Sequence, residues 1–230
     1  STDDARPVLT GVLIEMGGNT MTLAAADGFR LSVRTAQLAE KVPASKAIVP
    51  ARALAELGRI LSDGEETVTM TLPPNRGQVI FRSKNVELVS QLIDGTFPDY
   101  RSIIPTSYST RSVLSTSAFL KACKAADIFA REAAHSARLH VAPGSQLEPG
   151  KVEITATAAE TGSNETMVDA TVDGSAIDIA FNVRFLVEVL NVIDTPNVAL
   201  ETNSTSSPGV IKPVGREDFL HVVMPMHLGC

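Results

Sequence analysis

Along most of the chain, apolar and polar positions follow the pattern of short β-strands. Apolar residues alternate with polar ones in Phe29–Val33, and similar short runs lie between clusters of Gly, Pro, Asn and Asp. The strand-like runs are 8–15, 21–25, 29–33, 67–72, 78–83, 87–92, 138–141, 152–156 and 165–172, with further strands expected up to residue 228. Segments of this kind predict antiparallel strands, and the pair Gly17-Gly18 predicts a hairpin turn.

Three other segments have the spacing of amphipathic helices, with apolar residues three and four positions apart. They are a helix that begins at Pro50 and ends at Leu61, residues 118–132, and residues 183–193. The side chains expected to face the core are Leu54, Leu57, Ile60 and Leu61 in the first, Phe119, Ala122, Cys123, Ala126 and Ala130 in the second, and Leu186, Val189, Leu190 and Ile193 in the third.

The opposite sides of these helices carry cations: Arg52, Arg59, Lys121, Lys124, Arg131 and Arg184. If they share one surface, Lys and Arg at helical spacing would form a track for backbone phosphates that does not read base sequence. Solvated helix faces are the alternative, because charges on a helix usually face water. Ile128 lies among these polar positions beside Phe129, and it is either a surface residue or part of a subunit contact.

The segment Thr22–Arg34 predicts a hairpin, with a tight turn at Asp27-Gly28 where Gly tolerates a positive φ. The turn would fix the directions of Phe29, Arg30 and Leu31, which could form one wall of a binding groove. The alternative is that Phe29 and Leu31 belong to the core while Arg30 is a surface charge.

The two halves of the chain resemble each other. Residues 48–61 align with 180–193 at an offset of 132, so that Arg52 falls on Arg184 and Glu56 on Glu188. We therefore predict two copies of one α+β domain, residues 1–105 and 106–230, each with helices packed on antiparallel sheets. The polar segment 94–115 is expected to be an extended linker. The first copy begins just before its first strand and is expected to lack its leading helix.

Composition and charge narrow the class of protein. With 44% hydrophobic residues and a mean hydropathy of +0.12, the 230-residue chain can fill a core, and no apolar run approaches the length needed to cross a bilayer. We expect a soluble, intracellular protein. Cys123 and Cys230 are expected to be free thiols. The net charge of −6 argues against a protein that binds nucleic acid with its whole surface, but not against one cationic face.

No pattern of residues predicts catalysis. The four histidines, His135, His140, His221 and His227, have no metal-binding spacing, and no nucleophile or phosphate-loop motif follows a strand. We therefore expect no catalytic residue, metal or cofactor, and a binding role rather than an enzyme. An enzyme with a poorly marked site and a β-rich interaction adaptor without a DNA role are the alternatives.

Several segments together resemble the bacterial sliding clamp, the β subunit of DNA polymerase III. They are AADGFRL (25–31), IVPARALAEL (48–57), LIDGTFPDYRSIIP (92–105), FNVRFLVEVLNVI (181–193) and VVMPMHL (222–228). They occur in the family's order over nearly the whole chain. The chain resembles the second domain without its first helix, followed by the third domain.

The resemblance implies a fold, an activity and partners. Members of the family have three clamp domains per subunit, and two subunits close head to tail into a ring with helices around duplex DNA. The chain would then be part of a cytoplasmic, non-enzymatic processivity factor that needs no cofactor and binds DNA without sequence preference. Its partners would be the replicative polymerase, the clamp loader and other proteins with clamp-binding motifs, and the full-length protein would be a homodimer without membrane contact.

Partner proteins of this family dock a short peptide between the second and third domains. By position, the resemblance assigns this peptide groove to Arg6, Leu9, Ala26, Gly28, Phe29, Arg30, Leu31, Pro98, Ser102, Ile103, Asn182, Phe185, Val222, Met224, Pro225, Met226, His227 and Leu228. Methionine suits such a surface because its unbranched side chain repacks around different peptides.

Four groove positions depart from the family pattern. Ala26 stands where Thr is often found, Phe29 where His is common, and Ser102 and His227 where Arg is common. These residues keep the apolar pocket but remove polar contacts. The resemblance also assigns the DNA-facing role to the six helix cations and the subunit contact to Ile128 and Phe129.

Overall fold

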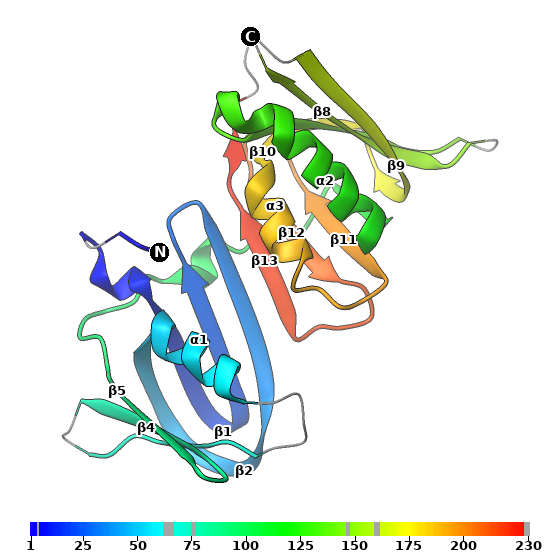
Figure 1. Cartoon of the computed structure of the whole chain (residues 1–230). Coiled ribbons are helices and arrows are strands. Elements are labelled where there is room, and N and C mark those ends of the chain that lie inside the picture. Colours follow the sequence, from blue (N-terminus) through cyan, green and yellow to red (C-terminus); the bar gives the residue numbers. More distant parts are fainter. Residues whose placement is uncertain (4, 62–66, 75–76, 146–147, 159–161, 228–230) are drawn as a thin grey trace. The chain divides into compact units, whose positions relative to one another are not determined.

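The chain forms two compact units, Ser1–Tyr100 and Arg101–Cys230. The structure, a computed structural model, describes residues 1–3, 5–61, 67–74, 77–145, 148–158 and 162–227 (Figure 1). The division between the units falls inside a short 3₁₀ helix, η2 (Tyr100–Ile103). Each unit is therefore considered by itself.

Unit 1 is built on two long antiparallel strands and one α-helix. Its elements are η1 (Pro7–Thr10), β1 (Gly11–Ala26), β2 (Arg30–Pro50), α1 (Ala51–Ile60), β3 (Thr69–Thr71), β4 (Gln78–Ser83) and β5 (Val86–Gln91). β1 pairs with β2 from Ala26 opposite Leu31, next to the turn, to Gly11 opposite Pro50. β3, β4 and β5 form a separate three-stranded sheet. The helix α1 lies across β1 and β2 (Figure 1).

The predicted hairpin turn at Gly17-Gly18 is wrong. Both glycines lie inside β1, where the register with β2 shifts between Met16 and Gly18 and again between Gly18 and Thr20. Gly18 has φ +61°, a conformation that glycine adopts without a steric penalty. The glycine pair therefore permits an irregularity of the β-bulge type within a long strand and does not reverse the chain.

The core of unit 1 is small, and α1 covers it only in part. Ile14, Val49, Val79 and Phe81 are buried, and Leu54 and Leu57 of α1 pack against them while staying half-buried. Ile60, expected to face the core, is 39% exposed at the last position of α1. Among the described residues of unit 1, α1 is the one α-helix, which agrees with the expectation that the first copy lacks its leading helix.

Unit 2 contains one continuous antiparallel sheet and two helices. Its elements are β6 (Thr110–Ser115), α2 (Thr116–Ala130), η3 (Arg131–Ala133), β7 (Ser136–Ala142), β8 (Gly150–Ala158), β9 (Gly162–Gly174), β10 (Ile177–Asn182), α3 (Val183–Leu190), β11 (Asn197–Thr202), β12 (Gly209–Pro213), β13 (Phe219–Val223) and β14 (Pro225–Met226). Within this unit the strands follow the order β13-β12-β11-β6-β9-β8-β7-β10-β14. The prediction of a wholly extended linker over 94–115 is wrong, because η2 and β6 lie within it.

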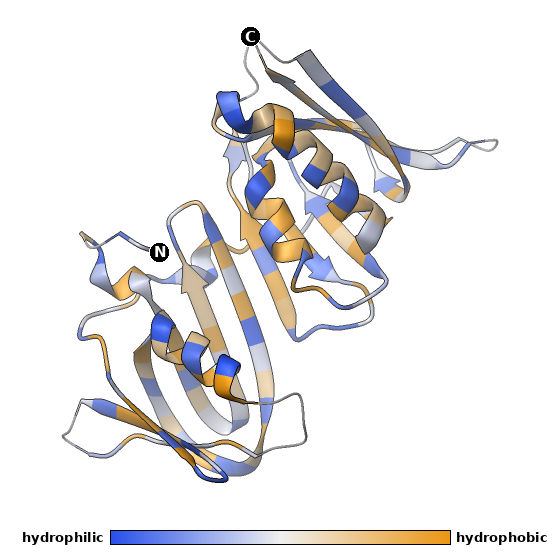
Figure 2. Cartoon of the chain, viewed as in Figure 1, coloured by the Kyte–Doolittle hydropathy of each residue, from blue (hydrophilic) through white to orange (hydrophobic). Residues whose placement is uncertain are grey.

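The two helices of unit 2 pack against each other and against the sheet (Figure 1). All five α2 residues predicted to face the core are buried, as are Leu186, Val189, Leu190 and Ile193 of the α3 segment. No residue of α1 is fully buried, whereas its repeat counterpart α3 has four buried residues. Hydrophobic and hydrophilic positions alternate around the helices, as Figure 2 shows. Both helix patterns of unit 2 are thus confirmed.

Two close contacts position the helix ends of unit 2. A Cβ atom placed on Gly209 of β12 would lie 2.5 Å from Cζ of Phe181, whose ring is fully buried just before α3. After α2, Ala134 and His135 both have positive φ, and Nδ1 of His135 lies 2.6 Å from Oδ1 of Asp127. Cys123 is buried in α2 as a free thiol, and burial raises the pKa of this thiol. Cys230 lies outside the described residues.

Candidate functional site

The predicted cationic side chains of all three helices are exposed. Arg52 and Arg59 lie on α1, Lys121 and Lys124 on α2, and Arg184 on α3, with Arg131 just beyond α2 in η3. Their opposite faces carry the buried or half-buried apolar side chains. The amphipathic pattern therefore turns these cations away from the core of each unit, as phosphate binding would require.

Two of the exposed arginines are already paired with a carboxylate on the same helix. Nη2 of Arg59 lies 2.8 Å from Oε2 of Glu56, and Nε of Arg184 lies 3.6 Å from Oε1 of Glu188. The hydrogen bonds from Arg59 to Glu56 raise the pKa of its guanidinium. In the part of the chain that the structure describes, Lys121 and Lys124 of α2 form no ion pair.

The hairpin turn of unit 1 presents an aromatic ring to solvent. Phe29 is 62% exposed, whereas Leu31, two residues later, is buried. Gly28 has φ +93°, and a Cβ atom placed on it would lie 3.0 Å from Nη1 of Arg6. Arg6 also donates through Nη2 to the carbonyl oxygen of Asp27, at 3.4 Å. At this turn, Arg6, Gly28 and Phe29 are thus exposed. Leu9 and Leu31, by contrast, are buried in the unit.

Asp27 organises this turn through its carboxylate. Oδ1 accepts from the backbone N–H groups of Phe29 and Arg30, at 3.0 and 3.1 Å, and Oδ2 accepts from Nε of Arg30 at 2.8 Å. Burial by itself would raise the pKa of Asp27, but these hydrogen bonds together lower it below its ordinary value. Arg30 is therefore neither a free surface charge nor a core residue, because it is tied to the turn.

Replacing Asp27 with Asn should destabilise unit 1 by about 1–2 kcal/mol at pH 7, because charged hydrogen bonds are lost at a partly buried site. The pKa of Asp27 is lowered by folding, so its contribution is complete above about pH 4 and disappears as the pH falls through the folded-state value. Urea unfolding of the variant and the parent at several pH values measures this. Exposed Asp94→Asn is the control and should change little. A difference between D27N and the parent that does not shrink as the pH falls below about 4 would contradict the electrostatic origin.

The groove residues near the boundary of the units are mostly exposed. Pro98 is exposed next to buried Phe97, whose ring meets that of Tyr100 edge to face with centroids 6.4 Å apart. Ser102 and Ile103 are exposed in η2. Ala26, at the end of β1, is half-buried.

The groove residues of unit 2 lie at the start of α3 and at the end of the chain. Asn182 caps α3, since its Oδ1 accepts from the N–H of Arg184 at 3.1 Å, and Phe185 is half-buried one turn later. Val222 is buried in β13, and Met224 is 38% exposed. Pro225 and Met226 form β14, which pairs with Ala180 and Phe181 of β10. His227 is exposed, and Leu228 lies outside the described residues.

The residues assigned to a subunit contact differ in exposure. Ile128 is 61% exposed on α2, whereas Phe129 is half-buried against the core of unit 2. In the same unit, β9 pairs with β8 over Gly162–Ala170 and with β6 only over Ala170–Gly174. Within the described residues, the first half of β9 is therefore paired on one side, which is the kind of edge that accepts another strand.

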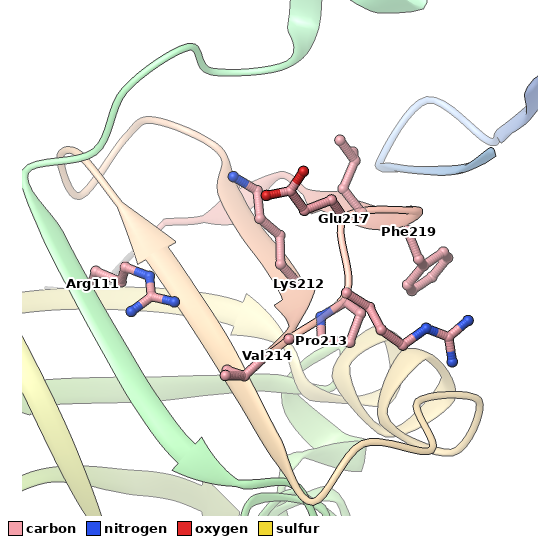
Figure 3. A pocket seen from close by; sticks show the side chains of 9 residues that line it. Arg111, Lys212, Pro213, Val214, Glu217 and Phe219 are labelled. Atoms are coloured by element: carbon pink, nitrogen blue, oxygen red, sulfur yellow. The ribbon is translucent and has the colours of Figure 1, made fainter.

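A pocket of about 630 Å³ on unit 2 was not foreseen from the sequence (Figure 3). It lies between Arg111 of β6, Lys212 of β12 and the turn that leads to Phe219. Arg111 and Lys212 share Glu201, at 3.5 and 2.7 Å, and Arg216 binds Asp194 and Asp218, at 2.7 and 2.9 Å. Each lining cation is thus paired with a carboxylate outside the lining, and Glu217 adds a further acid within it, so the pocket has no surplus positive charge. Apart from Arg111, the lining residues all lie within 212–220, at the end of β12, in the turn that follows it and at the start of β13.

Over the described ranges, no three His, Cys, Asp or Glu side chains are placed to hold a metal ion. His135 and His140 instead lie beside single aspartates, Asp127 at 2.6 Å and Asp178 at 3.0 Å. The described helices include none that is long and apolar enough to span a membrane.

Comparison with known proteins identifies the family. Residues 1–99 match the family model of the DNA polymerase III beta subunit, central domain, and residues 101–227 match that of its C-terminal domain. The beta sliding clamp of Staphylococcus aureus is 33% identical over 227 residues, which is 98% of this chain and 58% of the relative. The chain thus spans less than two thirds of the curated relatives it matches.

Solved structures agree with this match. The DNA polymerase sliding clamp of Bacillus subtilis is 28% identical, with a TM-score of 0.92 over 100% of this chain and 59% of that one. The sliding clamp of Pseudomonas aeruginosa bound to griselimycin is also 28% identical, with a TM-score of 0.90 over 99% of this chain and 60% of that one. Because family models match both units, the chain belongs to the DNA polymerase III beta subunit family and comprises its central and C-terminal domains.

Proposed function

We propose that the chain acts as part of a sliding clamp, a non-enzymatic processivity factor that encircles duplex DNA in the bacterial cytoplasm. The observation that carries this proposal is the family match over both units. The exposed cations of α1, α2 and α3 support it, because they could attract phosphates without contacting bases. Base-specific hydrogen bonds would instead stop a clamp at particular sequences.

In this function the clamp is a homodimeric ring that tethers other proteins to DNA. The partners are the replicative polymerase, the clamp loader and further proteins with clamp-binding motifs. The exposed Ile128 and the half-paired strand β9 support a subunit contact on unit 2. The exposed Phe29 and Met224 support docking of apolar peptides, and griselimycin is a suitable ligand with which to test it.

The DNA-binding part of the proposal predicts weak, sequence-independent binding of duplex DNA by the 230-residue chain. Affinities for two labelled duplexes of unrelated sequence should agree within about twofold and fall steeply with salt, by about 0.9 log units per log unit of salt for each phosphate contacted. The double variant K121A/K124A should weaken both equally. Fluorescence anisotropy at several salt concentrations measures this. A strong preference for one sequence, or no binding at low salt, would favour an adaptor without a DNA role.

A further inference from the structure

The three helices that carry the cations also carry acids, and their net charges are small. α1 has Arg52, Arg59 and Glu56, for a net charge of +1, and α3 has Arg184 and Glu188, for a net charge of zero. α2 has two lysines and Asp127, for a net charge of +1. The cationic faces are therefore much weaker than a count of Lys and Arg suggests.

The acids on α1 and α3 occupy the same position of the internal repeat. Glu56 and Glu188 are 132 residues apart, the offset that also aligns Arg52 with Arg184. Their arginine partners differ, however, because Glu56 binds the residue three positions after it and Glu188 binds the residue four positions before it. The carboxylate thus holds a fixed place on both helices, while the arginine that it neutralises does not.

These ion pairs contribute little to stability. All four side chains are about half exposed or more, at 74% and 54% for Arg59 and Glu56 and at 62% and 47% for Arg184 and Glu188. Exposed pairs of this kind are screened by water and salt, so their effect on folding is small. Their main physical consequence is electrostatic, because a guanidinium beside a glutamate attracts a phosphate less strongly. Arg59 also donates to Glu56 through Nε and Nη2, which leaves it fewer free N–H groups to offer.

We propose that Glu56 and Glu188 weaken the grip of the helix arginines on DNA and thereby keep the clamp mobile. This inference rests on the proposed function, since it concerns the same cationic faces. Each carboxylate competes with phosphate oxygens for one arginine. A phosphate must therefore compete with a carboxylate that is already in place, so its contact with the arginine is weaker than with an unpaired one.

The test compares Glu56→Gln and Glu188→Gln with Glu87→Gln in the 230-residue chain. Glu87 of β5 pairs with Arg82 of β4, with exposures of 50% and 54%, so E87Q removes the same charge and also frees one arginine, but on a strand and not on one of the three helices. Glutamine keeps the size and helix propensity of glutamate. Binding of a labelled 30-base-pair duplex is measured by anisotropy at several salt concentrations.

E56Q and E188Q should each bind the duplex about two- to fivefold more tightly than the parent at low salt, with a salt slope steeper by up to about 0.9. E87Q should bind like the parent, and thermal unfolding of all variants should match the parent. An equal gain in E87Q would assign the effect to net charge and overturn the proposal. Parent-like binding in both helix variants would overturn it while leaving the phosphate track intact. If neither the parent nor any variant binds DNA, the proposed DNA function itself fails.

Discussion

Replacing Phe119 with alanine should destabilise unit 2 by about 3–5 kcal/mol, the usual effect of deleting a fully buried aromatic ring. Phe119 has no exposed surface and belongs to the core formed by α2, α3 and the sheet. Neighbouring elements on several sides hold the ring, so the cavity cannot readily collapse. Urea unfolding followed by circular dichroism measures the loss.

Ile128→Ala provides the matched control on the same helix. Ile128 is 61% exposed, so its truncation should change the unfolding free energy of the chain by less than about 0.5 kcal/mol. A similar loss in both variants would mean that α2 does not pack by the face described. Any effect of I128A on subunit association is a separate quantity. It is measured by the sedimentation of a ring-forming protein in analytical ultracentrifugation.

The peptide docking proposed above predicts that griselimycin binding weakens when an exposed apolar side chain assigned to the groove is truncated. Phe29→Ala and Met224→Ala are each expected to weaken binding tenfold or more, because a few aromatic or large apolar side chains carry most of the energy of peptide recognition. Both side chains are partly exposed, at 62% and 38%, so their truncation should leave folding nearly unchanged. Isothermal titration calorimetry measures the affinity.

Val89→Ala is the control for this experiment. Val89 is also an exposed apolar residue, at 49%, but it lies on β5 and outside the residues assigned to the groove. Its truncation should leave griselimycin binding within about twofold of the parent. Loss in only one of F29A and M224A would remove the other residue from the site, and binding unaffected by both would remove both residues from it.

The sequence predicted the helices of unit 2 well because their apolar spacing is regular. All five residues of α2 expected in the core are buried there, since Phe, Cys and Ala at helical spacing leave one clear apolar face. The same reasoning failed at Ile60 of α1. Among the described residues of unit 1, no second α-helix packs beside α1. The apolar face of α1 is therefore wider than the protein surface that covers this face.

Other predictions were wrong because the same sequence pattern is compatible with two different local structures. Gly17-Gly18 permits a positive φ in a turn and in a bulge alike, and only the partner strand decides between them. The strand β6 was missed because its polar residues, Thr110 and Ser112, are buried by their neighbours in unit 2 rather than exposed as in a linker. Local pattern cannot reveal such burial.

The candidate site was only partly visible in the sequence. The turn at Asp27 and the intrahelical Arg–Glu spacing are local and could be read directly. The pairing of His135 with Asp127 depends on two consecutive residues with positive φ, which the residues Ala and His do not signal. The charge balance of the pocket near Lys212 likewise depends in part on the pairing of Arg111 with Glu201, which lie far apart in the sequence.

Gly209 should be the least replaceable residue of β12, although its backbone is extended and would suit any amino acid. A methyl group there would collide with the ring of Phe181, which is fully buried in the core of the unit. Phe181 directly precedes Asn182, the residue that caps α3. The absence of a side chain at Gly209 of β12 therefore sets the distance between the sheet and α3. In a saturation library scored for folding, this position should tolerate almost nothing, while exposed Thr205, in the turn before β12, should accept many substitutions.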